Sequence, residues 1–126
     1  MTDALPTYST VTPYLVVPDA DREIEFLTRA FGATAVEVHR GPDQTVMHAE
    51  LRIGDSLVML GQSGDHVKAR SAALYLWVTD VDATYAAALT AGATSESAPE
   101  DKPYGHRNAG IIDPNGVTWW IGAPVA

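Results

Sequence analysis

The stretch Leu15–Gly32, LVVPDADREIEFLTRAFG, decides the fold, because a close copy of it returns as Leu76–Gly92, LWVTDVDATYAAALTAG. Matched positions lie 61 residues apart, so that Asp19 corresponds to Asp80. A period of about 60 residues in two copies is too long and too few for a solenoid. The repeat therefore indicates an internal duplication.

The same offset holds outside this stretch. It places Ser56–Gly61, SLVMLG, over Val117–Gly122, VTWWIG, and so places Met59 on Trp120. Two modules of about 60 residues would each be marginally stable alone. We therefore expect a single domain over residues 1–126, in which module one (about 10–61) and module two (about 73–123) share one core and a connector (about 61–72) joins them.

Composition excludes several classes of protein. The 126 residues contain no cysteine, which excludes disulfides and thiolate metal sites and leaves His, Asp and Glu as possible ligands. A net charge of −8 with only eight Lys and Arg argues against nucleic acid as a partner. No run of about 18 apolar residues and no N-terminal signal-peptide pattern occur, so we expect a cytoplasmic protein without a membrane partner.

Module one has the pattern β-α-β-β-β. Asp19 is a good N-cap for a helix and Gly32 a good stop for it. Thr45–Ile53 alternates, which puts Met47, Ala49, Leu51 and Ile53 on one face of a strand. The expected strands are Thr12–Val17, Ala35–His39, Thr45–Ile53 and Leu57–Leu60.

Module two repeats the plan, with a helix over Asp80–Ala91. Its expected strands are Ala73–Val78, Thr94–Ala98, Asn108–Ile112 and Val117–Ile121, and Pro99–Arg107 is expected to be a long loop. The fold class is α+β, with eight strands in curved mixed sheets and two main helices.

These modules, together with the segments TPYLVVPDAD, MHAELRIGDSLVML and DPNGVTWWI, resemble the vicinal oxygen chelate superfamily of glyoxalase, bleomycin-resistance and extradiol dioxygenase proteins. The closest resemblance is to its PhnB-like branch, and it covers about residues 10–123. In the metal-dependent members, four side chains facing into the cupped sheets bind a divalent ion. Those positions map here onto Thr12, Met59, Ala73 and Trp120. None of the four is a good ligand for a hard metal, so we expect no metal there and no cofactor.

The side chains that replace the ligands are informative. On the cup-facing side, the resemblance places an aromatic and thioether surface in which Tyr14, Met59, Tyr75, Trp77 and Trp120 should converge. Such walls suit a planar or amphipathic organic molecule. The alternative is that these rings fill the interior.

Polar candidates lie nearby. His48, Glu50 and Arg52 share one face of a strand, so His48 and Glu50 could jointly hold a proton, or a metal with a third group, or belong to a hydrogen-bonded ladder on a half-solvated sheet. In the second module Tyr104 and Arg107 could orient an anionic ligand, or Arg107 could pair with the chain's own carboxylates. His39 has no supporting context and is expected to be exposed.

Three functions follow. The first is a metal-free protein of the bleomycin-resistance type that binds an aromatic or planar drug or metabolite, as in antibiotic resistance. The second is a divalent-metal-dependent lyase, isomerase or dioxygenase. The third is a metal-free isomerase or lyase in which His48 moves a proton and Glu50 orients it. We favour the first and expect a homodimer with a small-molecule ligand.

Overall fold

The structure is a computed structural model that describes residues 8–125, so residues 1–7 and 126 of the expected domain lie outside the described part. Most of the N-terminal stretch on which the cytoplasmic prediction rests falls there too. The elements are β1 (Tyr14–Val17), α1 (Ala20–Phe31), β2 (Thr34–Arg40), β3 (Val46–Ile53), β4 (Ser56–Gln62), β5 (Ala73–Trp77), α2 (Val81–Thr90), β6 (Thr94–Asp101), β7 (His106–Ile112) and β8 (Thr118–Pro124). None of the described helices has the length and apolar character needed to cross a membrane.

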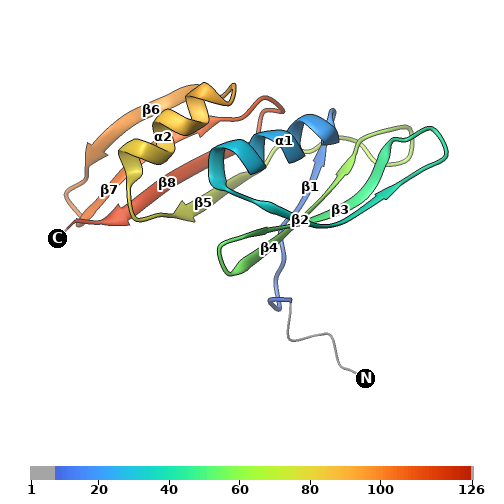
Figure 1. Cartoon of the computed structure of the whole chain (residues 1–126). Helices are drawn as coiled ribbons and strands as arrows, with labels where there is room; N and C mark the ends of the chain where they lie inside the picture. Colours follow the sequence, from blue (N-terminus) through green and yellow to red (C-terminus); the bar gives the residue numbers. More distant parts are fainter. Residues whose placement is uncertain (1–7, 126) are drawn as a thin grey trace.

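The two modules form two four-stranded mixed sheets, which confirms the predicted fold. The strand orders are β1-β4-β3-β2 and β5-β8-β7-β6, with β1 parallel to β4 and β5 parallel to β8. Figure 1 shows the modules next to each other, with α1 and α2 as neighbours. Tyr14 pairs with Met59 and Tyr75 pairs with Trp120, so the 61-residue repeat is also a repeat of strand register.

Both helices begin where the sequence predicts. The Asp19 carboxylate accepts a hydrogen bond from the Arg22 backbone N–H (3.1 Å), and Asp80 accepts one from Ala83 (3.0 Å). These caps satisfy backbone donors that have no partner inside the helix. Gly32 ends α1 in the left-handed conformation, with φ of 68°, which glycine adopts without the steric cost of a Cβ.

The prediction of a long loop over Pro99–Arg107 is wrong. β6 continues to Asp101 and β7 begins at His106, so the loop covers only residues 102–105. β6 is an edge strand, where a proline can be tolerated although it lacks an N–H for the ladder. The sequence pattern therefore understated the length of both strands.

The predicted position of Met47 on the buried face is also wrong, because 65% of Met47 is exposed and Val46 is buried instead. His39 on β2 pairs with His48, while Arg40 pairs with Val46, so Met47 is an extra residue in the ladder. Such a β-bulge shifts the alternation of side chains by one position. Beyond the bulge, Ala49, Leu51 and Ile53 are buried as expected.

One hydrophobic core joins the modules. The faces of the two sheets that pack toward the helices contribute buried apolar side chains, among them Leu15, Val17, Leu51, Leu60, Ala109, Ile111, Trp119 and Ile121. Each fully buried side chain of this size contributes about 1.5–3 kcal/mol through the hydrophobic effect. The opposite face of each sheet, here called the open face, carries the polar and aromatic side chains of the candidate site.

The modules are also joined by a polar junction between α1 and the turn before β8. Asn115 in that turn accepts a hydrogen bond from the Asp19 N–H (3.0 Å) and donates to the carboxylate of Glu23 (3.0 Å). The Asp113 carboxylate accepts from the backbone N–H groups of Asn115 and Val117 and from the Trp119 indole (3.0 Å). This junction fixes the start of α1 against the second module.

Glu23 is fully buried in the junction, and its Oε2 has no hydrogen-bond partner among the described residues. Burial, and secondly the neighbouring carboxyl group of Asp113, raise the pKa of Glu23 to about 9, against the lowering effect of the Asn115 amide. A proton on Oε2 removes a buried negative charge and supplies a donor toward Asp113. Glu23 is therefore neutral in the folded protein at pH 7.

Candidate functional site

The aromatic part of the candidate site lies on the open face of module two. The ring centroids of Tyr75 and Trp77 are 4.7 Å apart, and His106 packs edge to face against Trp77 at 5.0 Å. Tyr104 packs against His106 at 5.5 Å. We call Tyr75, Trp77, Tyr104 and His106 the aromatic cluster. The sequence prediction brought Tyr75, Trp77 and Tyr104 to the site and missed His106.

Glycines on neighbouring strands let the rings lie against the sheet. A Cβ at Gly122 would overlap the Tyr75 ring, and a Cβ at Gly110 would come within 2.5 Å of the Trp120 ring. Gly122 pairs with Trp77, and Gly110 pairs with Trp120, so each glycine leaves room beside the edge of a pair. The small side chains of β7 and β8 are therefore part of the site.

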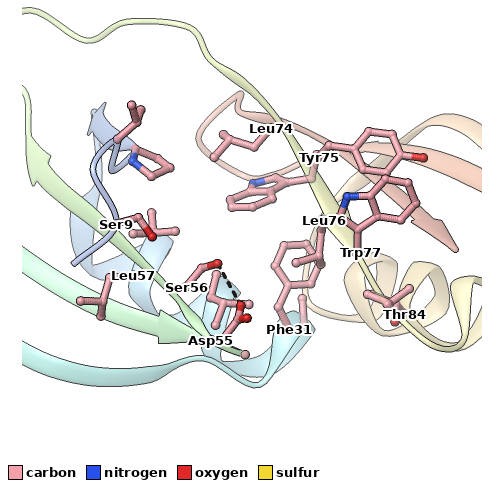
Figure 2. A pocket seen from close by; sticks show the side chains of 18 residues that line it. Ser9, Phe31, Asp55, Ser56, Leu57, Leu74, Tyr75, Leu76, Trp77 and Thr84 are labelled. Atoms are coloured by element: carbon pink, nitrogen blue, oxygen red, sulfur yellow. Dashed lines mark hydrogen bonds between the residues drawn. The ribbon is translucent and has the colours of Figure 1, made fainter. Parts of the chain in front are cut away.

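A hollow of about 460 Å³ begins beside the aromatic cluster. Its walls come from both modules: the β3–β4 hairpin, the end of α1, β5 and Trp119. In Figure 2, Leu57 and Ser56 lie on one side of the hollow and Leu74 and Leu76 on the other. The volume lies within the range of 300–1,000 Å³ that is typical of small-molecule sites.

The five residues expected to converge do not do so within one chain. Tyr14 and Met59 are neighbours in the sheet of module one, whereas Tyr75, Trp77 and Trp120 belong to the sheet of module two. Of the five, only Tyr75 and Trp77 line the hollow. Within the described part of the chain, the modules contact each other mainly through α1 and α2.

Arg107 is engaged by carboxylates of its own chain. Its guanidinium donates two hydrogen bonds to Asp82 (3.0 and 3.2 Å) and one to Asp101 (3.0 Å). These interactions, that with Asp82 being the strongest, raise the pKa of Arg107 further above its already high value. An anionic ligand would have to compete with both aspartates, which favours the alternative that Arg107 is a structural residue.

The polar part of the site lies on the open face of module one. His48 Nε2 lies 2.9 Å from Glu50 Oε2, and the Tyr8 hydroxyl donates to Glu50 Oε1 at 2.8 Å. The Tyr14 hydroxyl lies 3.4 Å from His48 Nδ1, and the two rings stack with centroids 5.7 Å apart. The sequence prediction paired His48 with Glu50 correctly in space, while Tyr8 was missed because strand pairing does not involve it.

The Glu50 carboxylate is well prepared to carry a negative charge. Its side chain is only 8% exposed. The hydrogen bond from His48, more than any other contact, lowers the pKa of Glu50, and the Tyr8 hydrogen bond acts in the same direction against the effect of burial. Glu50 is therefore a carboxylate whose negative charge is held by two hydrogen-bond donors.

The residues at the superfamily's metal positions do not fit a metal. Thr12 donates its hydroxyl to the Ser9 carbonyl (3.1 Å), and Met59, Ala73 and Trp120 offer no carboxylate or imidazole. In the described residues 8–125, no three His, Asp or Glu side chains are arranged as a metal centre. No step of a reaction can be assigned to a metal at that position.

Phe31 and Trp119 are further lining residues that sequence reasoning missed. Their rings pack at 5.0 Å, and both contribute to the hollow. Trp119 alternates with Trp120 along β8, so the period of two could have placed it toward the helices. Its contact with Phe31 depends on the packing of one module on the other, which the sequence does not give.

Comparison with known proteins agrees with this architecture. TioX from Micromonospora sp. ML1 has a solved structure that superposes with a TM-score of 0.76 at 26% identity, covering 94% of this chain and 98% of TioX. A glyoxalase-related enzyme from Fulvimarina pelagi gives a TM-score of 0.73 at 19% identity, covering 91% of this chain and 87% of the enzyme, which shows likeness of fold alone.

The sequence is also similar to proteins of mycobacteria. It is 39% identical to the uncharacterized protein Mb0911c of Mycobacterium bovis, over 91% of this chain and 83% of that protein, and equally identical to Rv0887c of Mycobacterium tuberculosis, over 91% and 74%. Residues 8–121 match the family described as the Glyoxalase/Bleomycin resistance protein/Dioxygenase superfamily. The duplicated module, the two four-stranded sheets and this match together show that the chain belongs to that superfamily.

Proposed function

We propose that the protein binds a planar or aromatic organic molecule, a drug or a metabolite, at the aromatic cluster and does so without a metal at the superfamily's position. The observation that carries the proposal is the exposure of the rings: 41% of Tyr75, 57% of Trp77 and 65% of Tyr104 are accessible to solvent. Large apolar side chains gathered on one exposed surface mark a ligand or partner site.

The hollow beside the cluster supports the same proposal. Aromatic rings at its edge offer a stacking surface, and stacked pairs contribute about 0.5–1.5 kcal/mol beyond the area they bury. Ser56 and Thr84 add hydroxyl groups to the lining, which can orient a polar substituent. A ligand that stacks on Trp77 and enters the hollow would contact both modules.

We further propose a homodimer. The outer edges of β1 and β5 pair with no strand among the described residues, and Tyr14, Met47 and Trp77 are exposed on the open faces. Free strand edges are commonly covered by a partner in soluble proteins. A second copy that brings module one of one chain to module two of the other would unite the five residues that one chain keeps apart.

Three finer assignments belong to this proposal. The quoted segments support a place in the PhnB-like branch, and the superfamily's description includes bleomycin resistance proteins, which supports a role in antibiotic resistance. The ligand would be held in the cytoplasm, as the sequence predicts. The acid–base alternative retains one observation, the hydrogen bond between His48 and Glu50.

Replacing Trp77 with Ala is expected to weaken ligand binding by about 2 kcal/mol or more, or roughly 30-fold, if Trp77 is a central anchor. The measurement is a tryptophan fluorescence titration with acridines, flavins and bleomycin in the presence of a chelator. Met47→Ala is the matched control, since it removes an equally exposed apolar side chain outside the cluster. Unchanged emission with every compound would refute the binding proposal.

Sedimentation velocity at micromolar concentration tests the assembly. We expect a species of about twice the chain mass of 13.4 kDa, because the free edges and exposed open faces are covered in a dimer. A species of the chain mass alone across this range would contradict the dimer and leave the aromatic cluster as a site within one chain.

A further inference from the structure

Four side chains that can ligate a metal lie in two directly opposed pairs on the open face of module one. On the adjacent strands β2 and β3, His39 pairs with His48 and Glu37 pairs with Glu50. Positions two apart on a strand point to the same side, and the intervening Ala49 is buried on the opposite side. We propose that His39, His48 and Glu50, with Glu37, form a site for a divalent cation of the zinc type.

The distances suit this role. His48 Nε2 and Glu50 Oε2 are 2.9 Å apart, close to the separation of two neighbouring ligands that each lie about 2.0–2.2 Å from one zinc ion. The centroids of the His39 and His48 rings are 6.1 Å apart, with planes inclined by 31°. An ion about 2.1 Å from one nitrogen of each ring can bridge imidazoles at this distance. The cation would replace the proton now shared by His48 and Glu50.

Two tyrosines already hold the ligands in place. The Tyr8 hydroxyl donates to Glu50 Oε1 and leaves Oε2 available, and the Tyr14 hydroxyl lies against His48 Nδ1. In protein metal sites, ligating histidines and carboxylates are usually oriented by such hydrogen bonds from the side away from the ion. A lone His–Glu pair on a solvated strand would need neither contact.

Only half of the site is closed without the ion. His39 Nε2 is bonded to Glu37 Oε1, and these side chains are 63% and 48% exposed on the edge strand β2. Exposed side chains of this kind change rotamer readily. Binding would turn His39 away from Glu37 and toward His48, a movement within one pair of strands that leaves the core unchanged.

Two other interpretations of these residues are weaker. A general acid–base pair needs only His48 and Glu50, and it does not account for a second His–Glu pair in register with the first. Separate surface ion pairs do not account for the burial of Glu50 or for its contact with Tyr8. The cation site uses all of these features, and it lies on different residues from the superfamily's metal positions.

The test is a zinc chloride titration of protein that has been stripped of metal with a chelator and dialysed, followed by calorimetry and by elemental analysis. We expect one ion per chain with micromolar or tighter affinity. His39→Asn and Glu37→Gln change exposed residues and should fold normally; His39→Asn should weaken binding at least tenfold, and Glu37→Gln by less. Tyr8→Phe should weaken it about tenfold if Tyr8 orients Glu50.

His66→Asn, in the exposed connector, is the matched control and should bind zinc like the unmodified chain. Cobalt(II) in place of zinc should give a visible spectrum that is lost in His39→Asn. The proposal is overturned if zinc does not bind stoichiometrically at about 100 µM, or if His39→Asn and the control bind alike. Planar-ligand binding at Trp77 is measured on its own, so either proposal can fail without the other.

Discussion

Replacing Glu23 with Gln is expected to make the protein more stable above about pH 5 and to remove a large part of the pH dependence of its unfolding. The folded chain holds the Glu23 proton up to a pKa of about 9, whereas the unfolded chain releases it near pH 4.5. Between these values the folded state binds more protons, so the free energy of unfolding falls as the pH rises. The slope from this one group is at most about 1.4 kcal/mol per pH unit.

Glutamine suits the site because it reproduces the protonated carboxyl group. Its amide oxygen can accept the Asn115 hydrogen bond that Glu23 Oε1 accepts, and its NH₂ can donate toward Asp113 as the proton does. Urea unfolding at pH 5, 7 and 9 measures the effect. The control is Glu25→Gln, an exposed residue of the same helix. A variant that follows the pH profile of the unmodified protein would show that Glu23 is ionised in the fold.

Asp113→Ala is expected to cost about 3 kcal/mol or more of unfolding free energy. The Asp113 carboxylate is 3% exposed and accepts hydrogen bonds from two backbone N–H groups and from the Trp119 indole. Alanine leaves these donors without their acceptor, and each unsatisfied buried polar group costs about 1–3 kcal/mol. The loss also frees Trp119, which packs against Phe31 across the module junction.

Denaturant unfolding at pH 7 measures this loss, with Asp55→Ala as the control. Asp55 also lies in a turn between two strands, but it is exposed and its carboxylate accepts only from the Ser56 hydroxyl (3.3 Å). Asp113→Asn should lie between the two, because its amide keeps one acceptor oxygen. A cost below 1 kcal/mol for Asp113→Ala would mean that water replaces the carboxylate.

Local features of the fold were accessible from the sequence because they depend on neighbouring residues. The caps at Asp19 and Asp80 and the stop at Gly32 act within one turn of helix, and the duplication fixed the order of strands. The extent of β6 and the bulge at Met47 were not accessible, since both depend on how two strands align.

The candidate site divides in the same way. His48 and Glu50 lie on one strand, so their contact follows from the period of two. His39 was predicted to be exposed, which is correct, but its position opposite His48 depends on the register of β2 with β3. The convergence of Tyr14 with Trp77 depends on how modules are placed in space, and the 61-residue repeat does not specify that.

The glycines beneath the aromatic rings show how the duplicated halves have diverged. Glu50 and Met59 pair in module one, and the corresponding pair in module two is Gly110 and Trp120. A large indole has thus been accommodated by loss of the side chain beside it, while the helix-facing residues Leu60 and Ile121 remain apolar and fully buried. Stability is carried by one face of each sheet and recognition by the other. Such a protein can evolve a new specificity through paired exchanges of side-chain volume, with little loss of the stability on which further change depends.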